Sequence, residues 1–172
     1  ACQSLDSLYQ KLTDLDVPLF VHASSTDGVG GLKDDRLSQH NLSLSLGYAQ
    51  EETLTVAQLL LGGVLDRHPT LDVCVSHGGG TAAFLAEKID QLAQVDPAAS
   101  ESVKRNGFGH ELQNLWFDTH VKGEVAAAAL RHYAHEDKLV LGTNLGGFDT
   151  PEALSADAAR LSQNARRLLR LP

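Results

Sequence analysis

Four short apolar segments alternate with helical segments along the chain, and this alternation constrains the fold more than any other feature. The apolar segments cover residues 17–21, 71–75, 115–117 and 138–141. Each is too short for a helix and almost entirely apolar, which is typical of strands covered on both faces. Strands that alternate with helices form parallel sheets with right-handed crossovers. The sequence therefore predicts an α/β fold on a four-stranded parallel sheet, in a single domain covering residues 1–172.

The helical spacing of apolar residues locates the helices between these strands. It predicts helices over residues 5–15, 53–63, 81–95, 124–133 and 156–171. We expect Thr53 to cap the second of them and a short helix near residues 42–46. The polar stretch 96–111 is expected to be a connection without helices. The predicted order is one helix followed by four strand-helix units.

Composition and charge exclude several classes of partner. The chain has 22 acidic and 14 basic residues, a net charge of −8, whereas nucleic-acid binding needs a clustered basic surface. No apolar run approaches the roughly 18 residues that a membrane span needs. We therefore expect neither nucleic acid nor a membrane as a partner. Cys74 lies inside an apolar segment and should be a buried thiol, and two cysteines form no disulfide framework, so we expect a cytoplasmic location.

Polar residues follow each predicted strand directly. They are His22, Ser76 with His77, Asp118 with His120, and Thr143 with Asn144. The C-terminal ends of parallel strands form one face, where ligands and catalytic groups gather in α/β folds. Imidazoles are the commonest ligands for zinc-like metals, and two of them with one oxygen ligand leave a position open for water or substrate. The pattern predicts a hydrolytic or decarboxylating metal centre.

Several of these residues also have simpler interpretations. His120 is either a site residue or a solvated strand end, and Asp118 either orients an imidazole or satisfies backbone donors. Lys88 and Arg67 either receive a substrate carboxylate or are solvated cations. The remaining histidines lie in loops or near helix ends, where we expect surface roles: His40, His68, His110, His132 and His135. The glycines 78–80 lack the Lys and Ser/Thr of a phosphate loop, so we expect a tight turn beneath His77.

Six short motifs together resemble one family. They are PLFVH (18–22), DRHP (66–69), SHGGG (76–80), WFDT (116–119), LGTN (141–144) and NA (164–165). In this order and spacing they resemble the amidohydrolase-2 family of metal-dependent hydrolases and decarboxylases. The resemblance covers nearly the whole chain.

The resemblance implies roles for particular residues. It implies a metal-dependent (β/α)8 TIM barrel in which His22 is a metal ligand on the fifth strand and His77 a catalytic residue on the sixth. Asn144 stands where the family has a catalytic and metal-binding Asp on the eighth strand, and His120 and Lys88 would contact substrate. The implied cofactor is a divalent metal, zinc first and manganese as the alternative. A site that binds no metal is a further alternative, because the amide of Asn144 lacks the charge and the proton-carrying ability of Asp.

The resemblance further implies that this chain is the C-terminal half of the barrel, with strands five to eight. The family's His-x-His pair on the first strand has no counterpart in the sequence. A barrel typically needs about 250 residues, and four strands left open would expose two pairing edges. We therefore expect an oligomer with a companion chain that supplies the first half of the barrel, or a longer protein that contains both halves.

Three functions follow from these expectations. The first is a metal-dependent decarboxylase or hydrolase subunit that acts on a small carboxylated or ring-derived substrate and is active only with its partner. The second is a catalytically degenerate scaffold or regulatory subunit of such an enzyme, because fold alone does not establish activity. The third is an open, flavodoxin-like binding module, which would be monomeric.

Overall fold

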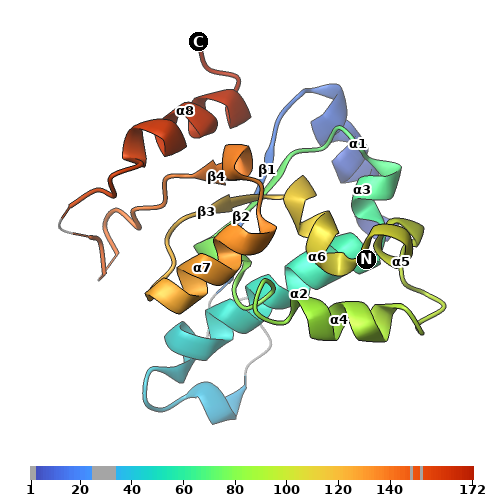
Figure 1. The fold of residues 1–172 in the computed structure, drawn as a ribbon, viewed down its shortest axis with the longest axis horizontal. Helices are drawn as coiled ribbons and strands as arrows, with labels where there is room; N and C mark the ends of the chain where they lie inside the picture. The colour runs from blue at the N-terminus through green and yellow to red at the C-terminus, as the bar shows by residue number, and fades with distance from the viewer. Residues whose placement is uncertain (1–2, 25–33, 148, 152) are drawn as a thin grey trace.

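The computed structural model describes residues 3–24, 34–147, 149–151 and 153–172 (Figure 1). Its strands are β1 (Leu19–Val21), β2 (Val73–Val75), β3 (Trp116–Asp118) and β4 (Leu139–Val140). They form one parallel sheet in the order β1-β2-β3-β4, with Phe20 opposite Cys74 and Cys74 opposite Trp116. The four-stranded parallel α/β architecture predicted from the alternation of strands and helices is confirmed.

Eight α-helices occur among the described residues. They are α1 (Asp6–Asp14), α2 (Tyr48–Leu61), α3 (Val64–Arg67), α4 (Ala86–Ala93), α5 (Glu101–Asn106), α6 (Phe108–Glu111), α7 (Glu124–Tyr133) and α8 (Ala158–Leu168). A π-helical turn, Ser43–Gly47, leads directly into α2. It lies where the sequence predicts a short helix, near residues 42–46. None of the helices in the described part of the chain is both long and apolar enough to cross a membrane.

The start of α2 differs from its predicted position. The helix begins at Tyr48, so Thr53 lies inside it and is not the cap. The Thr53 hydroxyl donates to the Ala49 carbonyl oxygen at 2.6 Å and accepts from the Thr81 amide at 2.8 Å. Thr53 therefore joins α2 to the turn that follows β2.

The stretch 96–111 also differs from its prediction, because it contains α5 and α6. The Ser100 hydroxyl accepts from the Val103 amide at 3.3 Å and caps α5. Val103 and Phe108 are fully buried. They are five residues apart, which is not the spacing of one helical face, so the sequence pattern misses two short helices separated by Gly107.

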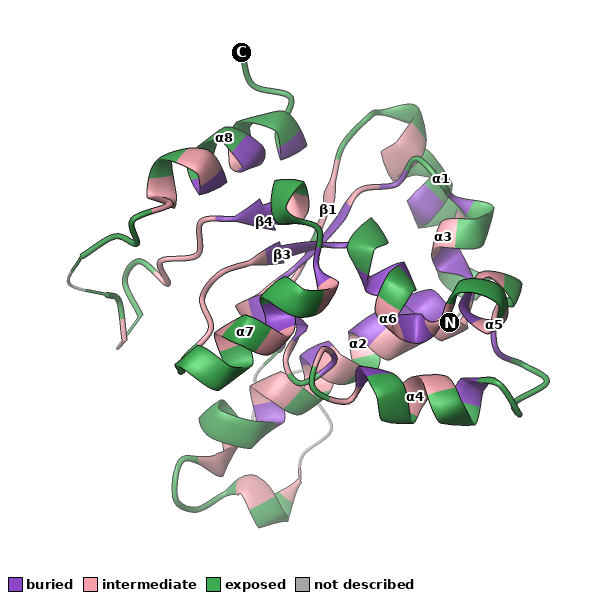
Figure 2. Ribbon diagram, viewed as in Figure 1, coloured by how far each residue is buried: buried purple, intermediate pink, exposed green. Residues whose placement is uncertain are grey.

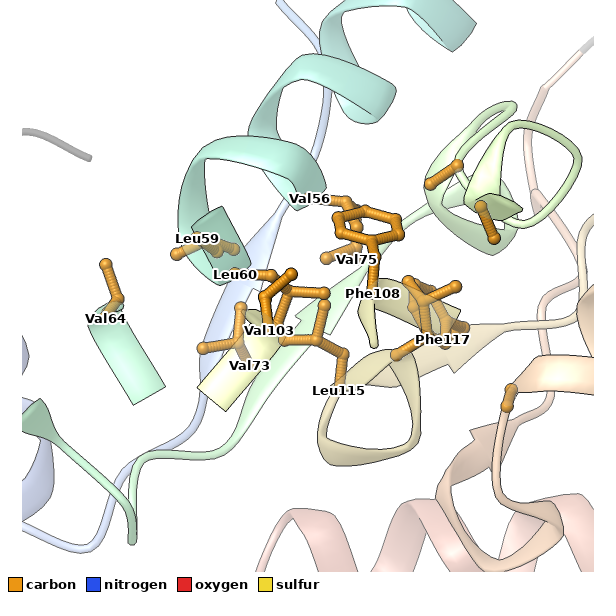
Figure 3. Close-up of a cluster of buried hydrophobic side chains, with 14 of the residues drawn as sticks. Val56, Leu59, Leu60, Val64, Val73, Val75, Val103, Phe108, Leu115 and Phe117 are labelled. Atoms are coloured by element: carbon orange, nitrogen blue, oxygen red, sulfur yellow. The ribbon is translucent and has the colours of Figure 1, made fainter. Parts of the chain in front are cut away.

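One face of the sheet packs against most of the helices. The buried side chains there come from β2, β3, β4, α2, α6 and α7, and include Val73, Val75, Leu115, Phe117, Leu139, Val56, Leu60, Phe108 and Leu130. Figure 3 shows Val56 of α2 and Phe108 of α6 beside Val75 and Phe117 of the strands. The strand residues at this face alternate with those at the other face, as the two-residue period of a strand requires.

Among the described residues, α8 is the helix that packs against the other face of the sheet. Cys74, Trp116 and Val140 are buried there with Leu168. Figure 1 shows α8 on the opposite side of the strands from α2 and α7. Cys74 is the buried thiol predicted from the sequence, and burial raises the pKa of its thiol to about 12.

Two polar contacts fasten α8 to the strands. The Asn164 amide nitrogen, buried inside the helix interface, donates to the carbonyl oxygen of Leu139 at 2.7 Å. The Arg170 guanidinium, just past the helix, contacts the carboxylates of Asp16 at 2.6 Å and Asp72 at 2.9 Å. These carboxylates precede β1 and β2, so the end of α8 lies near the N-terminal ends of the strands.

Both outer strands of the described sheet pair on one side only. β1 pairs with β2 and β4 pairs with β3. The central residue of β1, Phe20, is 56% exposed, although the central residues of β2 and β3 are buried. Figure 2 shows buried residues on the strands and on the helix faces turned toward them. An apolar ring exposed on an outer strand is typical of a surface that contacts another structure.

Candidate active site

Three imidazole rings lie together beyond the C-terminal ends of β1, β2 and β3. The ring centre of His77 is 5.0 Å from that of His22 and 5.4 Å from that of His120, and both pairs meet edge to face. His22 directly follows β1, and one residue separates His77 from the end of β2 and His120 from the end of β3. The structure thus brings together three of the side chains that the strand ends predict.

A glycine turn holds His77 in this position. His77 itself has φ +50, and each of the three glycines that follow also has a positive φ. A Cβ on Gly80 would lie 2.2 Å from the Ala49 carbonyl oxygen of α2, and one on Gly78 would lie 2.6 Å from the Val121 side chain. Only glycine fits such contacts in this backbone conformation, so the turn packs closely against α2.

A buried carboxylate of α2 fixes the His77 ring. Glu52 Oε1 lies 2.6 Å from His77 Nδ1, and the Glu52 side chain has no exposed surface. This hydrogen bond raises the pKa of His77, against the opposing effect of burial, and the Glu52, Asp118 and Asp149 charges raise it further. The nitrogen left for other partners is His77 Nε2.

The His22 ring is fixed through the same nitrogen. Its Nδ1 donates to the Ala23 carbonyl oxygen at 2.7 Å, which leaves Nε2 as the acceptor nitrogen. The Tyr48 ring packs near both imidazoles, 5.8 Å from His22 and 6.4 Å from His77 between ring centres. Metal-binding imidazoles commonly have one nitrogen engaged by an oxygen and the other free, as both rings do here.

His120 is held by two carboxylates. The Asp118 carboxylate accepts the His120 backbone amide at 3.0 Å, so Asp118 satisfies a backbone donor and does not bind the ring. The ring nitrogen His120 Nε2 lies 3.1 Å from Asp149 Oδ2. Asp149 Oδ1 in turn accepts from the Asn144 amide at 2.6 Å, which connects the end of β4 to His120.

A cavity of about 230 Å³ opens beside His120, between the ends of β3 and β4, α7 and the start of α8. Its wall combines apolar side chains with the cations Lys122 and Arg131 and the carboxylate of Asp157. Both cations lie near carboxylates, Arg131 at 4.0 Å from Asp157 and Lys122 at 3.6 Å from Asp149, so the wall carries charges of both signs.

The structure does not bring Lys88 or Arg67 to the histidines. Lys88 is an exposed residue of α4 and does not line the cavity beside His120. Arg67 pairs with Asp6 at 2.9 Å and donates to the backbone of Gly62 and Gly63. Its guanidinium therefore joins α1 to the turn before α3, and neither interpretation from the sequence, a substrate contact or a solvated cation, describes it.

Of the five histidines expected at the surface, four are exposed: His40, His110, His132 and His135. His68 is 7% exposed, so the expectation for it is wrong. Its ring packs edge to face on Tyr9 at 5.7 Å and lies 3.6 Å from an Asp6 oxygen. The reason is its place at the end of α3, which α1 covers.

The histidines match part of a metal site. His22 and His77 each present an unengaged Nε2, and an imidazole nitrogen is a ligand type that zinc and manganese bind. Catalytic metal sites use three or more protein ligands, and the described residues contain no group of three His, Cys, Asp or Glu side chains placed to hold a metal. The Nε2 atoms of His22 and His77 are therefore two positions that can each bind a metal or carry a proton, and not both at once.

Sequence reasoning missed three residues of this site: Tyr48, Glu52 and Asp149. Glu52 has a signal in the sequence, because it shares one face of α2 with the buried residues Val56 and Leu59. A carboxylate on an apolar helix face requires a buried partner. Asp149 lies in an irregular loop, and no periodicity points to its contact with His120.

Comparisons with known proteins extend this description. The chain is 28% identical over 141 residues to the 2-amino-3-carboxymuconate-6-semialdehyde decarboxylase of Dictyostelium discoideum, a match covering 82% of this chain and 38% of that protein. It is similar to the apo structure of IDCase from Metarhizium anisopliae, with TM-score 0.72 and 25% identity over 97% of this chain and 52% of that one.

A second solved structure shares the fold at lower identity. The 5-carboxyvanillate decarboxylase of Novosphingobium aromaticivorans, solved with manganese and a nitrobenzoic acid, gives TM-score 0.72 at 17% identity over 97% of this chain and 53% of that one. The chain thus spans about half the length of these two solved structures and less of the curated relative. The sequence pattern that defines the amidohydrolases matches residues 2–171, so this protein belongs to the amidohydrolase family.

Proposed function

We propose that this chain supplies the C-terminal half of a (β/α)8 barrel in a metal-dependent decarboxylase that acts on a small carboxylated, ring-derived substrate. The observation that carries the proposal is the row of His22, His77 and His120 at adjacent strand ends, with the His77 ring fixed by Glu52. The Dictyostelium relative and the Novosphingobium structure described above are decarboxylases, which supports decarboxylation as the reaction.

In the proposed site His77 is the proton carrier. Decarboxylation leaves a carbanion-like centre that needs a proton and a stabilising charge. The hydrogen bond that His77 Nδ1 donates to the Glu52 carboxylate raises the pKa of His77, which favours the protonated imidazole. Its unengaged Nε2 is the atom that would exchange this proton with the substrate.

The other residues bind and orient in this proposal. His22 would hold the divalent metal through Nε2, with zinc as the first candidate and manganese, found in the 5-carboxyvanillate decarboxylase structure, as the alternative. A bound metal would supply positive charge for the substrate's carboxylate. His120 and Asn144 would line the substrate side, whereas exposed Lys88 would contact substrate only through an assembly.

The barrel half requires a second half. Phe20 of β1 is 56% exposed on the sheet face that α8 covers only in part, and the described residues contain no group of three side chains placed to hold a metal. The matched structures are about twice the length of this chain. We propose that the missing strands and ligands come from a companion chain in an oligomer or from another part of a longer polypeptide.

One observation favours a different function for the chain. Asn144 stands where the family resemblance places an Asp, and an amide neither ionises nor carries a proton near neutral pH. A degenerate subunit that scaffolds or regulates an active partner is therefore the second candidate.

The experiment that separates the two candidates uses the chain together with the polypeptide that co-purifies with it. Release of CO₂ from 2-amino-3-carboxymuconate semialdehyde and from hydroxybenzoates is measured, with bound zinc and manganese quantified in the same samples. For an enzyme, His77→Ala lowers kcat by about 10²–10⁴-fold, His22→Ala removes the metal, and His132→Ala, an exposed control, changes neither. Metal-free complexes without activity, or activity unchanged by His77→Ala, would overturn the enzyme proposal.

A further inference from the structure

We propose that Asp149 is a positioning residue of this site, because its carboxylate holds the His120 ring through Nε2. The inference rests on the proposed function and deepens it. Asp149 Oδ2 lies 3.1 Å from His120 Nε2, and Asp149 Oδ1 accepts from the Asn144 amide at 2.6 Å. The three side chains form one chain of contacts across the ends of β3 and β4.

The loop that carries Asp149 is closed by its own hydrogen bonds. The Asn144 carbonyl oxygen accepts from the Gly147 amide at 2.8 Å and from the Thr150 hydroxyl at 2.7 Å. Asn144 has φ +45, and a Cβ on Gly147 would lie 2.2 Å from the Asn144 amide nitrogen. The Asn144 side chain therefore lies closely against Gly147, and there its amide donates to Asp149.

Burial and charge strengthen the contact with His120. The side chains of His120 and Asp149 are 9% and 23% exposed, so water competes little for the hydrogen bond. Lys122 Nζ lies 3.6 Å from Asp149 Oδ2 and donates to the Asp149 carbonyl oxygen at 3.0 Å. The Asn144 hydrogen bond and the nearby His120 and Lys122 lower the pKa of Asp149, which keeps it ionised at neutral pH.

The chemical consequence concerns which nitrogen of His120 carries hydrogen. An ionised carboxylate only accepts, so His120 Nε2 donates to Asp149 and Nδ1 is the nitrogen left to accept from a substrate. The same geometry explains why an amide suits position 144. An Asp there would bring two carboxylates to the 2.6 Å contact that Asn144 and Asp149 now make, and they would repel each other.

The test removes the Asp149 carboxylate and measures the tautomer of the His120 ring by NMR. In the assembled protein with ¹⁵N-labelled histidine, His120 is assigned through His120→Gln and its tautomer is read from the side-chain ¹⁵N shifts. Asp149→Ala is expected to abolish the preference for hydrogen on Nε2 and to lower kcat about 10–100-fold with KM changed less than about 3-fold. Asp137→Ala, which removes an exposed carboxylate 4.0 Å from His135, is the matched control. It is expected to leave the His120 tautomer and kcat unchanged.

A second variant keeps the charge and disturbs only the loop. Gly147→Ala places a methyl group against the Asn144 amide, so it should shift the His120 tautomer in the same direction as Asp149→Ala. An unchanged tautomer in Asp149→Ala overturns the inference, even if activity falls. If the tautomer shifts but no assembly decarboxylates any substrate, the proposed function fails and the positioning role of Asp149 stands.

Discussion

At the scale of residues, the active-site candidates fall into those with a sequence signal and those without one. His22 and His77 follow apolar strands directly, and parallel strand ends meet on one face, so their proximity could be predicted. Glu52 contacts His77 from a helix, and Asp149 contacts His120 from an irregular loop. Contacts between elements distant in the sequence depend on how those elements pack, which a pattern along one element does not contain.

The contact between Glu52 and His77 predicts a pH-dependent stability. Because the folded protein raises the pKa of His77 above its ordinary value of 6.5, the stabilisation is complete below that value and is lost as pH rises through the folded pKa. We expect Glu52→Gln to lower the free energy of unfolding by about 1–3 kcal/mol at pH 5.5 and by less at pH 9. Urea unfolding at both pH values measures this difference. Glu51→Gln, one residue earlier in α2, serves as control, and an equal loss at both pH values in Glu52→Gln would contradict the prediction.

At the scale of elements, the strands could be predicted better than the helices that lie between them. Each strand is a compact apolar run, whereas α2 begins in a region without clear periodicity, and α5 and α6 are too short to show any. The position of α8 alone on the second face of the sheet also has no signal in the sequence, because an amphipathic helix fits either face equally well.

The turn after β2 predicts a large effect for one glycine. Gly80 has φ +67, and an added Cβ would meet the backbone oxygen of Ala49, which has little freedom to move. We expect Gly80→Ala to cost about 3 kcal/mol of unfolding free energy, from backbone strain and overpacking together. Gly123→Ala is the matched control, since Gly123 has φ +92 with no atom within 4 Å of an added Cβ, and its cost should be about 1 kcal/mol. Equal costs in urea unfolding would mean that the close approach to α2 is unimportant.

At the scale of the whole molecule, the sheet has one well-covered face and one face covered only in part. α8 buries Cys74, Trp116 and Val140 but leaves Phe20 of β1 exposed. The resemblance to a barrel half predicts two open edges, and each outer strand of the described sheet pairs on one side only. The exposed ring and an open edge occur at the same strand, β1, so Phe20 is the residue at which the proposed barrel can be tested.

Phe20 therefore tests the proposed barrel directly. A solvent-exposed side chain contributes little to the stability of the chain that carries it, so Phe20→Glu should change the unfolding free energy of this chain alone by less than about 0.5 kcal/mol. In the proposed assembly the same ring is buried against the other half of the barrel, and a buried charge there should weaken association at least about 10-fold. Phe84→Glu provides the control, because Phe84 is 77% exposed just before α4, away from β1. Sedimentation velocity of each variant with the co-purifying polypeptide measures association, and equal association of the two variants would place the interface elsewhere.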